Sequence, residues 1–145
     1  MLKDLTSENL IRLNIEATDW EDAVRKAAQP LLEAGKVKQS YIDDIIVGAK
    51  ESGPYFVLAQ HVALPHARPE AGALESAIGV ATLATPVEFG SKANDPVKYL
   101  FCLSARNNTE HHDALAELAE RLEDQDNFKM LEHATDPKEV LHYQS

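Results

Sequence analysis

Two histidine-containing segments hold the strongest candidates for chemistry in this sequence. His66 lies in VALPHARPEAG, where Pro65 fixes the backbone just before the histidine and Arg68 follows it closely. A neutral imidazole nitrogen can attack phosphorus, and the charged group that results needs hydrogen-bond donors around it. The pattern therefore suits a site that holds a phosphate, although it also fits a solvated or structural histidine.

The second segment, ARNNTEHHDALAELAERL, predicts a helix with Asn108 or Thr109 as its N-cap. His111 then falls in the first helical turn. It shares one helix face with three leucines, Leu115, Leu118 and Leu122. We therefore expect His111 to point toward the sheet, at a helix N-terminus that favours anions, and His112 to be exposed. A capping or core-rim role for His111 remains open.

Other polar residues are weaker candidates. Lys50 ends a predicted helix close in sequence to His66, so we keep it beside Arg68 as a possible phosphate ligand; a cation at a helix C-terminus also has a purely structural explanation. We expect the remaining residues of this kind to lie in a strand, on surface helices or in the core: His61, His133, His142 and Cys102.

The sequence contains no nucleotide-binding glycine motif, no HExxH motif and no cysteine pair with zinc spacing. A metal site built from His66, His111, His61 and a carboxylate stays an alternative, and with it a metal-dependent hydrolase. Because no pair of these ligands has a signature spacing, we expect neither a metal nor a cofactor.

The surrounding pattern predicts one layered α/β domain over residues 1–145. We expect helices over about 6–12, from Thr18 or Asp19 to Gly35, and over 39–51, and strands within 55–64, 76–89 and 97–105. Helices are expected again at about 109–123, 126–133 and 137–142. The near-continuous apolar run 97–105 is typical of a strand buried on both faces.

These elements would bring the two histidines together. His66 follows one predicted strand and His111 follows another. If those strands are parallel, both side chains lie along one edge of the sheet, where sites in α/β folds are usually found.

Composition narrows the classes of function. The chain has 145 residues, 44% of them hydrophobic and 26% charged, a balance typical of a globular protein. Its formal net charge of −10 argues against nucleic acid as a partner. No apolar run is long enough to span a bilayer, the N-terminus does not read as a signal peptide, and the single cysteine suits a reducing cytoplasm.

At this point the residues resemble a known family. Glu51 followed by LAQHVALPHA (58–67) is similar to the signature of mannitol/fructose-type enzyme IIA domains of the bacterial sugar phosphotransferase system. The resemblance continues through TPVEFG (85–90), NDPVKYLFCLSA (94–105) and the helix that begins near His111. The stretch GPYFVLAQHVALPHARPEAG is similar, more narrowly, to the ascorbate-type branch.

The resemblance implies a mixed β-sheet flanked by helices on both faces. It implies that His66 accepts phosphate at Nε2 from the histidine phosphocarrier protein and passes it to a cysteine of enzyme IIB, which works with a membrane IIC transporter. His111 matches a second, supporting histidine. Lys50 stands where mannitol-type domains usually carry arginine, and lysine cannot make the same bidentate grip on phosphate.

The main rival interpretation is a regulatory module that is controlled by phosphorylation of His66. In that case no enzyme IIB would remove the phosphoryl group. We expect the transport role, because the chain reads as a free-standing domain without a regulatory extension.

Overall fold

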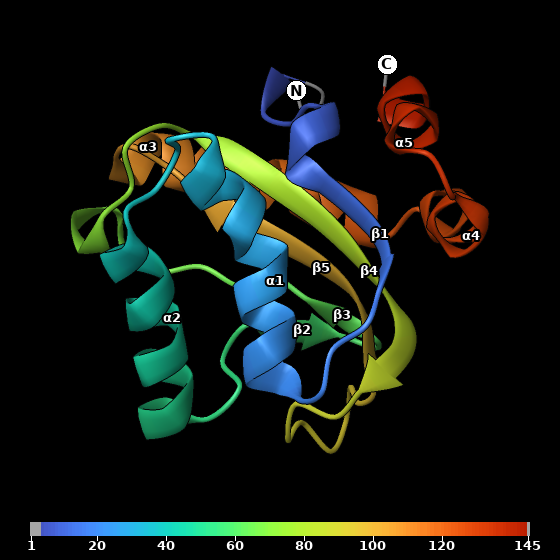
Figure 1. Ribbon diagram of the computed structural model, residues 1–145, viewed down its shortest axis with the longest axis horizontal. Coiled ribbons are helices and arrows are strands. Elements are labelled where there is room, and N and C mark those ends of the chain that lie inside the picture. The colour runs from blue at the N-terminus through green and yellow to red at the C-terminus, as the bar shows by residue number, and fades with distance from the viewer. Residues whose placement is uncertain (1–3, 145) are drawn as a thin grey trace.

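A mixed, open β-sheet forms the centre of the protein, whose computed structural model describes residues 4–144 (Figure 1). In that part of the chain the sheet has five strands, in the order β1-β4-β5-β3-β2. The strands are β1 (Ile11–Ile15), β2 (Val57–Ala59), β3 (Val62–Ala63), β4 (Ala77–Val87) and β5 (Val97–Ser104). Strand β1 runs parallel to β4, β3 runs parallel to β5, and the other two pairs are antiparallel.

Two helices cover one face of the sheet, α1 (Trp20–Glu33) and α2 (Gln39–Ser52), and Figure 1 shows them in front of it. Helix α1 begins where the Asp19 side chain accepts a hydrogen bond from the backbone N–H of Asp22. Helix α2 buries the inner residues that its spacing predicted: Tyr41, Ile42, Ile45, Ile46 and Ala49. It ends at Gly53, whose φ of +82° suits glycine.

The other face is covered by α3 (Asn108–Leu122), with α4 (Gln125–His133) and α5 (Pro137–Gln144) beside it. The protein has two hydrophobic core clusters, one on each face of the sheet. On this face, Leu118, Leu131 and Val140 of the three helices pack against β4 and β5. Helices on both faces explain the apolar run that was predicted to be a doubly buried strand, because Phe101 and Cys102 of β5 face opposite clusters. No helix among residues 4–144 is long and apolar enough to cross a membrane.

The segment 55–64, where strand structure was expected, forms a pair of short strands, β2 and β3. The turn between β2 and β3 contains His61, which adopts a positive φ of 68°. His61 therefore lies in a turn and not, as expected, within a strand, and its Nδ1 lies 2.7 Å from the Pro96 carbonyl oxygen.

The predicted helix over 6–12 is wrong. A short 3-10 helix, η2 (Glu8–Leu10), is followed directly by β1, which pairs with β4 through Ile11 and Val80. Only the local residue pattern favoured a helix here, whereas the strand is stabilised by a partner far along the chain.

Candidate functional site

An open cavity of about 800 Å³ lies at the carboxyl ends of β3 and β5. Four segments line it: helix α2, the turn that follows α2, the loop that follows β3, and the start of α3. His66, Arg68 and His111 are among its lining residues, together with Asn108 at the first position of α3. The parallel pairing of β3 with β5 thus places both histidines at one edge of the sheet, as predicted.

The loop after β3 is tied to the end of β5 by two contacts. The Leu103 N–H donates a hydrogen bond to the Pro65 carbonyl at 2.9 Å. The buried hydroxyl of Tyr41 on α2 donates to the Leu103 carbonyl at 2.6 Å and accepts from the Ala67 N–H at 3.1 Å. Because these groups flank His66 and precede α3, they fix the spacing between the two histidine-bearing segments.

The His66 ring is half-buried, and one of its nitrogens is already engaged. Its Nδ1 lies 2.7 Å from the Leu64 carbonyl oxygen. A carbonyl only accepts hydrogen bonds, so Nδ1 must carry the proton. This tautomer leaves the lone pair on Nε2, the nitrogen that can act as a nucleophile or bind a phosphoryl group.

His111 packs close to His66, with ring centroids 5.4 Å apart. Its Nδ1 is buried, and among the described residues it has no hydrogen-bond partner. Partial burial, followed by the proximity of His66 and then of His112, lowers the pKa of His111 below its ordinary value. Since a neutral imidazole has one donor and one acceptor nitrogen, His111 can donate a hydrogen bond to a group bound on His66.

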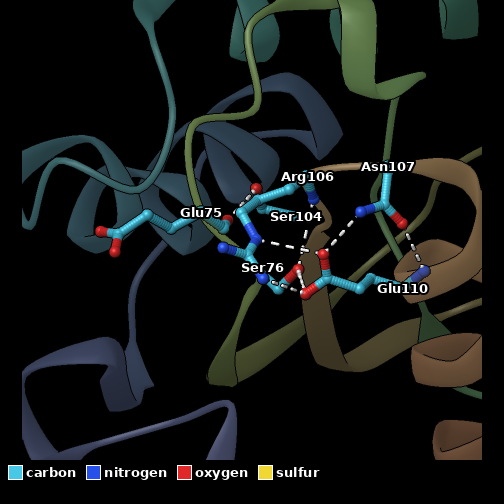
Figure 2. A network of polar contacts seen from close by, with 6 residues as sticks. All are labelled: Glu75, Ser76, Ser104, Arg106, Asn107 and Glu110. Atoms are coloured by element: carbon cyan, nitrogen blue, oxygen red, sulfur yellow. Dashed lines mark hydrogen bonds and ion pairs between the residues drawn. The ribbon is translucent and has the colours of Figure 1, made fainter.

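The start of α3 is held by a polar network (Figure 2). The Asn107 side chain accepts a hydrogen bond from the Glu110 N–H at 2.9 Å, so Asn107 is the N-cap, one residue before the predicted position. The Glu110 carboxylate receives two hydrogen bonds from Arg106, at 3.0 and 3.1 Å, and one from Ser76. Arg106 holds the pKa of Glu110 below its usual range. This network fixes the helical turn that carries His111.

The exit of the His66 loop is anchored to the start of α2. The loop passes through a 3-10 turn, η3 (Pro69–Ala71), and then Gly72, whose carbonyl accepts from the Lys38 N–H at 2.8 Å. A side chain at Gly72 would place its Cβ 2.7 Å from the Ser40 hydroxyl oxygen, so this close approach requires glycine. Arg68 is exposed within this anchored loop and lines the cavity.

Lys50 is not brought to this cavity. Its ammonium group lies 3.5 Å from the Glu21 carboxylate, and the residue lines a separate, smaller cavity with Trp20 and Phe89. The next residue, Glu51, does line the His66 cavity. Successive residues are about 100° apart around a helix, which explains why the two neighbours face different ways.

The remaining histidines lie as predicted on exposed surfaces: His112, His133 and His142. Cys102 is fully buried in β5, and burial raises the pKa of its thiol to about 12. Among residues 4–144, no group of three or more histidines, cysteines and carboxylates is placed to hold a metal ion.

Several lining residues escaped the sequence interpretation. Tyr55 contacts His66 from the turn before β2, and Asp44 and Val47 line the cavity from the face of α2 that also carries Glu51 of the signature. Their helical spacing was visible in the sequence, but only the packing of α2 beside the loop shows which face meets the site.

Comparison with known proteins agrees with this arrangement. Residues 4–144 match the family described as "Phosphoenolpyruvate-dependent sugar phosphotransferase system, EIIA 2". The ascorbate-specific PTS system EIIA component of Escherichia coli (strain K12) is 37% identical over 97% of this chain and 92% of its own length.

Solved structures give the same family. The mannitol-specific cryptic enzyme IIA CmtB of E. coli is 33% identical, with a TM-score of 0.87 over 97% of this chain and 95% of its own. The IIA subunit in a complex of E. coli enzyme IIAMTL with phosphorylated enzyme IIBMTL is 27% identical, with a TM-score of 0.82 over 94% of each chain. The chain therefore belongs to the EIIA type 2 family of the phosphoenolpyruvate-dependent sugar phosphotransferase system.

Proposed function

We propose that this EIIA component carries the phosphoryl group on Nε2 of His66, as part of a relay that feeds ascorbate uptake. The observation that carries the proposal is the pairing of His66 with His111 in an open cavity, with the His66 Nδ1 already engaged by the Leu64 carbonyl. The structure thus provides one free nucleophilic nitrogen beside a second imidazole that can donate.

The first transfer is a displacement at phosphorus. The lone pair of His66 Nε2 attacks the phosphohistidine of the histidine phosphocarrier protein, a P–N bond to Nε2 forms, and the P–N bond to the donor breaks. The donor imidazole leaves as a neutral base, and the phosphorylated His66 ring keeps its Nδ1 proton on the Leu64 carbonyl. Positioning supplies much of the catalysis, because the two nitrogens must approach in line.

The phosphoryl oxygens need donors that replace water. His111 is near enough to His66 to supply one, and the N-terminus of α3 adds the partial positive charge of its first N–H groups. Arg68 lines the same cavity and is exposed, so we assign it to the oxygens that face the partner protein. Lys50, which pairs with Glu21 away from the cavity, has no part in this proposal.

The second transfer passes the phosphoryl group to a cysteine thiolate of enzyme IIB, which serves a membrane IIC transporter. The complex of the mannitol IIA and phosphorylated IIB proteins supports an enzyme IIB partner of this kind. The ascorbate assignment is supported by the name of the 37% identical E. coli relative. We place the relay in the cytoplasm, where the donor and the reducing conditions that keep a free thiol are found.

A reconstituted relay tests this function. Purified protein is incubated with phosphoenolpyruvate, enzyme I and the histidine phosphocarrier protein, and its intact mass is measured before and after an ascorbate-type enzyme IIB is added. We expect one phosphate on the wild type, none on His66→Ala, and loss of the phosphate to enzyme IIB. Phosphate that is accepted but not drained would favour the regulatory alternative, and no phosphate at all would contradict the proposal.

A further inference from the structure

Tyr55 is set against His66 by a tight turn between α2 and β2. Gly53 ends α2, and its carbonyl accepts a hydrogen bond from the Tyr55 N–H at 2.8 Å. Pro54 stiffens the same turn, and its carbonyl accepts from the Val57 N–H at 3.1 Å. The backbone of Tyr55 is therefore fixed on both sides.

The phenol ring of Tyr55 packs against neighbours on two sides, although 38% of the residue is exposed to solvent. Its edge packs against Phe56, with centroids 4.9 Å apart. On the α2 side it lies over Gly48, where an added Cβ would be 3.4 Å from the ring, so the absence of a side chain leaves room for it. Burial raises the pKa of Tyr55 to about 12, which keeps the hydroxyl protonated and able to donate.

Two separate contacts join Tyr55 to His66. The Tyr55 hydroxyl donates a hydrogen bond of 2.5 Å to the His66 main-chain carbonyl. The two rings meet edge to face, with centroids 5.5 Å apart and an interplanar angle of 84°. With the Leu64 carbonyl on Nδ1, the histidine is contacted at its backbone, at its ring and at one nitrogen.

We propose that Tyr55 is a positioning residue that holds the His66 imidazole in one orientation and one tautomer, so that Nε2 points into the cavity ready for phosphoryl transfer. The hydroxyl fixes the backbone from which the imidazole projects, and the ring restricts its rotation. This inference rests on the proposed role of His66 as the phosphorylated residue.

Three variants separate the parts of this effect. Tyr55→Phe keeps the ring and removes the hydroxyl, and Tyr55→Leu removes both. Tyr99→Phe is the matched control, because Tyr99 packs against Phe128 on the opposite face of the sheet and does not line the His66 cavity. Thermal unfolding of each variant shows whether it folds. If Tyr55→Leu fails to fold, Tyr55→Phe, which keeps the ring, still tests the role of the hydroxyl.

The first readout needs no phosphorylation. Long-range ¹H–¹⁵N spectra of the unphosphorylated protein report which nitrogen of His66 carries the proton. We expect a single Nδ1–H tautomer in the wild type and in Tyr99→Phe, and a mixture of tautomers in Tyr55→Leu. If the wild type accepts no phosphate, the proposed function fails, but this comparison still tests whether Tyr55 determines the tautomer of His66.

The second readout is the single-turnover rate of phosphorylation at increasing concentrations of the phosphorylated carrier protein. We expect the maximal rate to fall about three- to tenfold in Tyr55→Phe, the size of one lost hydrogen bond, and on the order of 10²-fold in Tyr55→Leu. The donor concentration for half-maximal rate should change little. Wild-type rates in both Tyr55 variants, an unchanged His66 tautomer in Tyr55→Leu, or a change confined to the half-maximal concentration would each overturn the inference.

Discussion

The two segments that meet in the cavity are held by different kinds of interaction. The His66 loop is fixed by neutral groups, the hydroxyls of Tyr41 and Tyr55 and backbone hydrogen bonds, and Tyr41 is fully buried. The start of α3 is fixed by an exposed cap and an ion pair, Asn107 with Glu110 and Arg106 with Glu110. Exposed ion pairs contribute little free energy and are screened by salt.

The two histidines also differ in how their Nδ1 atoms are bonded. The Nδ1 of His66 is engaged by the Leu64 carbonyl, whereas the Nδ1 of His111 is buried without a partner among the described residues. We infer that the His66 ring, the proposed nucleophile, is oriented in advance by this contact, whereas the Nδ1 of His111, the proposed supporting residue, is not engaged by a side chain or backbone group in the described part of the chain.

Replacing His111 should have the largest effect on the rate of phosphorylation. We expect His111→Ala to slow phosphorylation of His66 about 10²-fold, the usual result of removing one preorganised donor to a transferring group. Single-turnover transfer from the phosphorylated carrier protein measures it, with His112→Ala as the matched control because His112 is exposed. Equal rates for the two variants would show that His111 is not a donor to the phosphoryl group.

Removing the buried hydroxyl on the His66 side should cost more stability than any change at the exposed network. Tyr41→Phe leaves the Leu103 carbonyl and the Ala67 N–H without their buried partner, and we expect the free energy of unfolding to fall by about 1–3 kcal/mol. Urea denaturation measures the change, and Tyr99→Phe serves as the control. A loss no greater than the control's would contradict the contrast.

Removing the cap on the His111 side should have a smaller effect on stability. Asn107→Ala loses the hydrogen bond to the Glu110 N–H, so the free energy of unfolding should fall by about 1 kcal/mol. Asn107→Asp retains a capping oxygen and should keep most of the stability. If Ala and Asp at this position behave alike, the side-chain cap does not hold the start of α3.

The smallest effect is a dependence of stability on pH. Because the folded protein lowers the pKa of His111, the unfolded chain binds protons more readily there, and stability should fall as pH drops below about 6.5. His66 and His112 act directly on His111, and the other charged residues of the cavity that it lines are Asp44, Glu51, Arg68 and Glu70. Denaturation at neutral and acid pH, compared between wild type and His111→Gln, isolates this contribution; the same slope in both would contradict it.

Much of the site was predictable from sequence because it depends on local signals. The loop with Pro65 and the helical spacing of His111 placed both histidines after strands, and the apolar run of β5 indicated a covered sheet. These inferences hold because each signal and its structural consequence lie within a few residues.

The parts that were missed depend on distant partners. Strand β1 exists because it pairs with β4, and nothing near Ile11 in the sequence specifies that partner. Tyr55 acts on a backbone carbonyl, which carries no residue-type signal in the sequence. The orientation of Lys50 toward Glu21 depends on how α2 packs beside α1, which spacing alone leaves open.

The most direct test of the account is to locate the phosphate on the phosphorylated protein by ³¹P and long-range ¹H–¹⁵N NMR. Because the Leu64 carbonyl holds the proton on Nδ1, we predict a single phosphohistidine at Nε2 of His66, with Nδ1 still protonated. Phosphate on Nδ1 of His66, or on His111, would contradict the central claim that the fold prepares one nitrogen of one histidine for transfer.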